Sequence, residues 1–153
     1  MSNGAQMNAV ERLKQVLETT PRRLADLSSA EASRREGPDR WSKKEFLGHL
    51  IDSAGNNLQR IVRMQIEHHL EFPSYQQESW VALQSYATES WPDLVNLWLL
   101  LNRHLLHVIH AVPESSLSYT WAIPGKDTIT LGEMIDSYVD HVEHHLESII
   151  GTS

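Results

Sequence analysis

The sequence contains no cysteine among its 153 residues. Disulfides, thiolate catalysis and cysteine-ligated zinc are therefore excluded, and any metal ion must be held by imidazole and oxygen ligands. No apolar run approaches the ~18 residues of a membrane span. The first residues also lack the basic segment followed by an apolar one that marks a secretory signal. We therefore expect a cytoplasmic protein with no membrane partner.

Positive charge is also scarce. Lys and Arg together number 13 against 20 Asp plus Glu, and the formal net charge is −7. This balance argues against a surface that binds phosphate backbones, so nucleic acid is not an expected partner. The hydrophobic fraction of 41% is ordinary for a globular protein. A chain of this length is most simply one domain, predicted over residues 1–153 with a core from about residue 8 to residue 151.

Two capping boxes predict where helices begin. Ser42 is followed three residues later by Glu45, and Thr130 is followed by Glu133 in the same way. In this pattern the first side chain bonds the backbone N–H of the glutamate, and the glutamate side chain bonds back to the cap. We therefore expect helices to begin just after residues 42 and 130.

Apolar periodicity extends the prediction to four helices, with no convincing strand. Their expected ranges are 8–18, 42–71, 90–111 and 130–151, with Pro21 starting a further turn after the first and Pro73 ending the second. Residues 28–40 are expected to form a loop. Residues 74–90 are expected to form a partly helical connector with Trp80 and Tyr86 in the core. Together these elements predict an all-α four-helix bundle with long crossover connections.

Three histidines lie within five residues of each other in the segment DHVEHHLES, residues 140–148. A helix advances about 100° per residue, so each position can be assigned to a face. His141 and His145 fall on or beside the apolar face, whereas His144 falls outside it. Two inward histidines one turn apart can bind one metal ion together. Core histidines bonded to carboxylates or backbone carbonyls would show the same spacing.

A third ligand would have to come from another helix, and two candidates exist. His104 lies at the edge of the apolar stripe of the third helix. His49 lies nearly opposite the apolar stripe of the second helix, so periodicity alone would place it in solvent. It belongs to a row of polar residues at helical spacing: Glu45, His49, Asp52, Asn56 and Arg60. Such a row is either a solvated surface or the lining of a polar cleft, and periodicity does not choose between them.

Three segments, in this order, resemble the DinB/YfiT-like superfamily: WSKKEFLGHLIDSAGNNLQR, YQQESWV and GKDTITLGEMIDSYVDHVEHHLESI. The resemblance runs from residue 41 to residue 150. It is carried by a histidine within a W-S-x-x-E-x-x-x-H-L-x-D-S frame, followed near the end by H-x-x-H-H. It implies a four-helix bundle with a divalent metal ion held by His49, His141 and His145, and it leaves His104 as the alternative.

The resemblance also implies two kinds of activity. Some members are transferases and isomerases that use low-molecular-weight thiols such as bacillithiol or mycothiol, and others have been proposed as metal-dependent hydrolases. The chain is therefore expected to be a thiol-dependent S-transferase or a hydrolase acting on a small molecule. Several transferase-like members carry a further histidine where this chain has Ala54. A bundle that binds a metal ion or small ligand without turnover, as a sensor or accessory module, is the alternative.

Three neutral imidazoles leave a coordination position open for water or for a thiol. Zinc and nickel are the first candidates for the metal, followed by iron and manganese. Asp52 and Asn56, on the same helix face as His49, are candidates for orienting the ligands or contacting substrate. Tyr138 and Trp121 are expected to pack in the core or to wall the pocket. The resemblance also allows a homodimer, because even-numbered assemblies are common in the family.

The remaining histidines could form a loose metal-binding surface. They share no single helix face, so scattered exposed side chains are the simpler interpretation. These residues are His68, His69, His104, His107 and His110.

Overall fold

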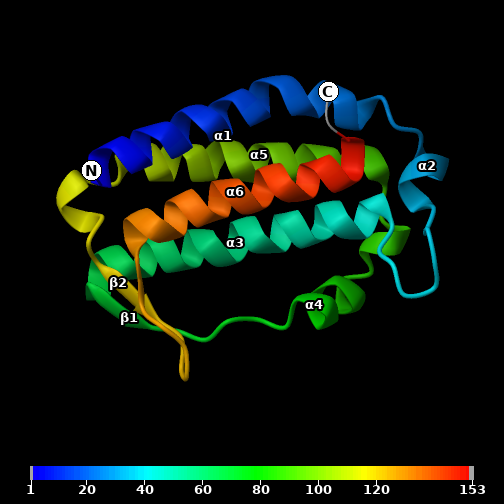
Figure 1. Cartoon of the computed structure of the whole chain (residues 1–153). Coiled ribbons are helices and arrows are strands. Elements are labelled where there is room, and N and C mark those ends of the chain that lie inside the picture. The colour runs from blue at the N-terminus through cyan, green and yellow to red at the C-terminus, as the bar shows by residue number, and fades with distance from the viewer. Residues whose placement is uncertain (1, 152–153) are drawn as a thin grey trace.

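The structure, a computed structural model, describes residues 2–151, with side chains described from residue 8 onward. Residues 1, 152 and 153 of the predicted domain lie outside that part, and the one-domain organisation stays a prediction. Four long helices form the body of the molecule: α1 (Ser2–Ala25), α3 (Lys43–Glu67), α5 (Trp91–Ala111) and α6 (Leu131–Ile150). In Figure 1, α1 and α6 run in one direction, and α3 and α5 run in the other. The predicted four-helix bundle is confirmed.

Both predicted capping boxes are present. Ser42 Oγ accepts from the Glu45 N–H at 3.3 Å, and the Glu45 carboxylate accepts from the Ser42 N–H at 3.0 Å. Thr130 and Glu133 form the same pair of bonds at the start of α6. A third box, Ser28 with Glu31, begins the short helix α2 (Ser29–Ser33). The prediction that residues 28–40 form only a loop was therefore wrong, although the S-x-x-E pattern was in the sequence.

Two predicted helix ends were also wrong. α1 continues through Pro21 to Ala25. Its last turn is held from outside the helix, because Leu24 is fully buried and its carbonyl accepts from the Trp91 indole N–H at 2.8 Å. α3 ends at Glu67, well before Pro73, because His68 adopts a φ of 62° and turns the chain into a strand.

A small sheet lies at one end of the bundle, where no strand was predicted (Figure 1). Its strands are β1 (His69–Glu71), β2 (Thr120–Ala122) and β3 (Ile129–Thr130). β1 pairs with β2 in parallel, and β2 pairs with β3 in antiparallel fashion. Strands of two or three residues carry no readable alternation. They form here because the ends of α3 and α5 bring residues 69–71 and 120–122 together.

The connection from β1 to α5 runs back along α3 and carries α4 (Gln77–Leu83) and the short 3₁₀ helix η1 (Tyr86–Thr88). Tyr86 is buried, as predicted, but Trp80 is 41% exposed, so its predicted core position was wrong. A second 3₁₀ helix, η2 (Glu114–Ser116), follows α5. No helix of the described part is both long and apolar enough to cross a membrane.

α3 is the most enclosed helix of the bundle. It packs against α5 and α6, and α4, η1 and β1 contact it as well. All residues from 47 to 54 are buried as a result. A helix with neighbours on several sides has no solvent face over these turns, which is why His49 and Asp52 of the polar row lie inside the molecule.

Candidate metal centre

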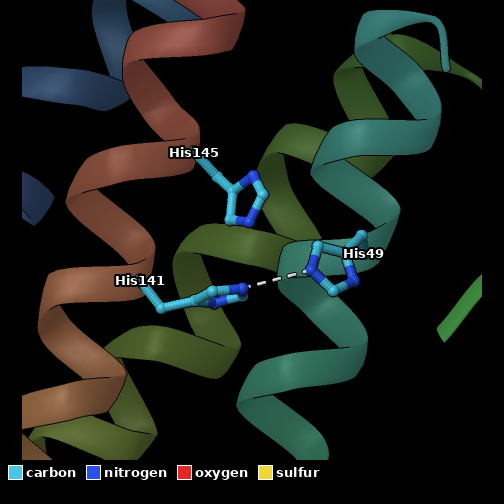
Figure 2. Close-up of side chains that lie close together, drawn as sticks. All are labelled: His49, His141 and His145. Carbon is cyan, nitrogen blue, oxygen red and sulfur yellow. Dashed lines mark hydrogen bonds between the residues drawn. The ribbon is translucent and has the colours of Figure 1, made fainter. Parts of the chain in front are cut away.

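Three histidines from two helices point toward one another (Figure 2). His49 lies two turns into α3, and His141 and His145 lie one turn apart on α6. Each offers a ring nitrogen that lies within 4.8 Å of those of the other two. Nε2 of His49 is 3.2 Å from Nε2 of His141. We call these three residues the histidine cluster; their role as metal ligands stays a prediction.

Aromatic side chains flank the cluster on the side of the α3 N-terminus. The ring centroids of Trp41 and His49 lie 5.2 Å apart, and those of Phe46 and His145 lie 6.0 Å apart. The two aromatic rings contact each other edge to face at 5.4 Å, as expected for residues that bracket a helix start. The segment that caps α3 therefore also shields the cluster, and His49 is only 1% exposed.

Burial keeps the cluster uncharged at neutral pH. Loss of hydration first, and then the neighbouring rings of His141 and His145, together lower the pKa of His49 to about 4. The pKa of His141 is also lowered to about 4, by burial first and then by His145 and His144. Burial lowers the pKa of His145 as well. A neutral imidazole has one nitrogen lone pair free to bind a cation.

The protein itself does not satisfy these rings as it would ordinary core histidines. Nδ1 of His49 and Nδ1 of His145 are buried without a hydrogen-bond partner in the described structure. Among the described residues, no carboxylate or backbone carbonyl bonds a ring of the cluster. The alternative that these are core histidines held by such groups therefore finds no support in the geometry.

The predicted accessory residues lie outside the cluster. Asp52 Oδ1 accepts from the Tyr86 hydroxyl at 2.8 Å and from the Gln84 amide at 2.7 Å. The Asn56 amide donates to the backbone carbonyl of Asp52 at 2.9 Å. Asp52 therefore anchors Tyr86 against α3. The predicted role of Asp52 and Asn56 in orienting the ligands or contacting substrate stays a prediction.

Ser53 is the residue that sequence reasoning missed. Its Oγ lies 3.5 Å from Nδ1 of His141. When that Nδ1 carries the proton, it donates a hydrogen bond to Ser53 Oγ, and the lone pair on Nε2 is left facing His49. The signal was available, because Ser53 is four residues after His49 and is the last position of the D-S pair in the frame.

The other histidines lie outside the cluster. His144 is exposed, and His104 is exposed on α5, outside the cluster, so His104 was wrong as an alternative third ligand. His68, His69, His107 and His110 are exposed as well. On the outer face of α6, Asp140 and Glu143 bond Arg12.

Comparisons with known proteins agree with the resemblance read from the sequence. The model of the DinB superfamily matches residues 12–149. The chain is 23% identical over 145 residues to a protein of Oceanobacillus iheyensis named "Putative metal-dependent hydrolase", with 94% of this chain and 81% of that protein covered. It is also similar to the solved structure of YfiT from Bacillus subtilis, described as "a probable metal-dependent hydrolase with an unusual four-helix bundle topology". The TM-score is 0.84 at 19% identity, and 94% of this chain and 83% of that one are covered. The chain belongs to the DinB superfamily.

Proposed function

We propose that this protein is a divalent-metal-dependent hydrolase of a small molecule, with His49, His141 and His145 as the metal ligands. The observation that carries the proposal is the convergence of three uncharged imidazoles from α3 and α6, with ligand atoms within 4.8 Å of one another. The descriptions of the two similar proteins as metal-dependent hydrolases support the reaction class.

The donor set fits a divalent ion. Two imidazole nitrogens bound to a tetrahedral zinc ion at about 2.0–2.1 Å lie roughly 3.4 Å apart. The observed separation between Nε2 of His49 and Nε2 of His141 is 3.2 Å. Three nitrogen ligands also match the pattern of catalytic sites, which keep a further position for water or substrate. Zinc and nickel remain the first candidates, with iron and manganese after them.

In such a site a divalent cation supplies Lewis acidity toward water and toward the polarised bond of a substrate. The chain supplies the surroundings. Trp41 and Phe46 exclude water from one side of the cluster. Ser53 lies within hydrogen-bond distance of Nδ1 of His141, and by accepting from that nitrogen it would favour the tautomer that keeps Nε2 free. No cysteine is present, so any thiol taking part would come from a second substrate.

The test uses adjacent histidines of α6 as a matched pair. Protein reconstituted with zinc or nickel is assayed against esters, amides and phosphate esters, with and without a low-molecular-weight thiol. We expect hydrolysis that a chelator abolishes and that His145→Ala loses, while His144→Ala keeps it because that side chain is exposed. Thiol consumption without hydrolysis would replace the proposal with S-transfer. Metal binding without turnover of any class would leave a binding module.

A further inference from the structure

A pocket of about 240 Å³ lies beside the histidine cluster, along the seam between α3 and α6. His141 forms part of its wall and so belongs to both the pocket and the cluster. Its polar lining includes Ser53, Arg60 and Tyr75, and its apolar lining includes Trp121 and Met134. Because the pocket opens onto a ring of the cluster, a molecule held in it would lie next to the proposed metal centre.

Arg60 is the unusual member of this lining. The residue is 6% exposed, and its Nε is buried without a hydrogen-bond partner. The guanidinium lies 4.2 Å from the Trp121 ring centroid and 5.8 Å from that of Tyr75. Throughout the part of the chain that the structure describes, no Asp or Glu forms an ion pair with it. A buried cation without an anion is costly, so its retention at a pocket wall points to a ligand.

The acid closest to Arg60 along the polar row does not neutralise it. Asp52 is two helical turns earlier on α3, does not line the pocket, and is bonded through Oδ1 to Tyr86 and Gln84. Tyr75 adds a second donor. Burial, and then the Asp52 carboxylate, raise the pKa of Tyr75 to about 12, so its hydroxyl keeps its proton at neutral pH. The pocket therefore offers a cation and a hydroxyl donor, both beside aromatic surface.

We propose that this pocket binds the carboxylate or phosphate group of a small organic anion, and that Arg60 is the residue that recognises it. A guanidinium binds either oxyanion through paired hydrogen bonds. Trp121 and Met134 contact the carbon part of the ligand. The proposal rests on the proposed function in one respect, namely that this anion is the substrate and that its reacting group lies at His141.

The experiment measures anion binding directly. Phenylacetate, phenyl phosphate and the neutral analogue phenylacetamide are titrated calorimetrically into zinc-loaded protein and into chelator-stripped protein. Carboxylates and phosphates can also bind a metal ion directly, so the stripped protein shows how much of the anion binding depends on Arg60 alone. We expect wild-type protein to bind at least one anion in both forms and the amide in neither. The preferred anion shows whether the natural group is a carboxylate or a phosphate.

The matched variants are Arg60→Gln and Arg63→Gln, which remove the same charge from α3. Arg63 is exposed and its Nε donates to Gln59, so its loss should leave anion affinity unchanged. Arg60→Gln should weaken binding by about tenfold or more. Arg60→Lys should retain part of the affinity, because it keeps the charge without the planar fork. If thermal denaturation shows that Arg60→Gln does not fold, the affinity of Arg60→Lys is compared with that of wild type instead.

Equal anion affinity in wild type and Arg60→Gln would overturn the proposal, as would equal binding of the neutral amide. Failure of wild type to bind any of the anions at millimolar concentration would overturn it too. The metal centre is tested separately by the zinc content of His49→Ala. If wild-type protein binds no zinc, or if His49→Ala binds as much zinc as wild type, the proposed function is refuted. Anion binding that depends on Arg60 would still support the anion pocket in that case.

Discussion

Two groups of histidines in this molecule differ in surroundings rather than in number. The histidine cluster lies between α3 and α6, whereas His104, His107 and His110 follow one another along α5 with exposed side chains. Both groups contain residues spaced about one turn apart. Only the first faces a second helix that contributes a further imidazole, together with aromatic rings that exclude water. Spacing along one helix therefore does not make a site; the opposing helix does.

Zinc affinity tests the difference between the two groups of histidines most directly. Removing one ring of the cluster by His141→Ala should weaken zinc binding several hundred-fold, because binding energies of about 10–16 kcal/mol are shared among roughly four ligands. His107→Ala should leave affinity unchanged, since that side chain is exposed on α5. Competition with a chromophoric chelator measures both variants. Equal losses in the two variants would show that the α5 histidines bind the ion.

The same comparison predicts a pH effect in metal-stripped protein. The pKa of His49 is lowered from 6.5 to about 4, so as the pH falls the unfolded chain takes up a proton before the folded one does. Stability should therefore be highest above pH 6.5 and decline as the pH falls toward 4. From about pH 8 to about pH 5 the decline due to His49 is of the order of 2 kcal/mol.

Urea denaturation at several pH values measures this effect. The decline should be smaller in His49→Ala and unchanged in His107→Ala, which controls for the protonation of carboxylates elsewhere. A His49→Ala variant with the same pH dependence as wild type would contradict the burial of an uncharged imidazole at this position.

A smaller effect tests the packing that encloses the cluster. A Cβ added at Gly48 would lie 2.2 Å from the Tyr86 ring, whereas a Cβ at Gly55, on the same helix, meets nothing within 4 Å. We expect Gly48→Ala to destabilise the fold by about 1–2 kcal/mol, because displacing Tyr86 outweighs the gain in helix propensity. Gly55→Ala should stabilise it by about 0.5–1 kcal/mol. Thermal denaturation distinguishes the two, and equal shifts would mean that Tyr86 does not pack on Gly48.

Local signals predicted much of the fold because they depend on neighbouring residues alone. Ser42 and Thr130 begin α3 and α6 through side chains three residues away, and such bonds form whatever the rest of the chain does. The three short strands could not be predicted in this way. Each is too short to show alternation, and β1 is held by pairing with residues that are distant in the sequence, as Leu70 pairs with Trp121.

The site residues also differ in whether local sequence patterns could predict their positions. The inward positions of His141 and His145 followed from the periodicity of α6, whose apolar residues lie on one face. His49 could not be placed in this way, because a helical wheel assumes one covered side and α3 is covered on several. The resemblance to a known family supplied what periodicity lacked. Arg60 lay in the same polar row, but its role beside the pocket depends on Tyr75 and Trp121, which come from connections between helices.

The most direct test of the metal centre is a crystal structure of zinc- or nickel-loaded protein with diffraction data collected at the absorption edge of the metal. We expect one anomalous peak per chain at about 2.0–2.2 Å from a nitrogen of each of His49, His141 and His145. A structure with no peak there, in which these rings bond only protein or water while the ion lies among the α5 histidines, would contradict the account.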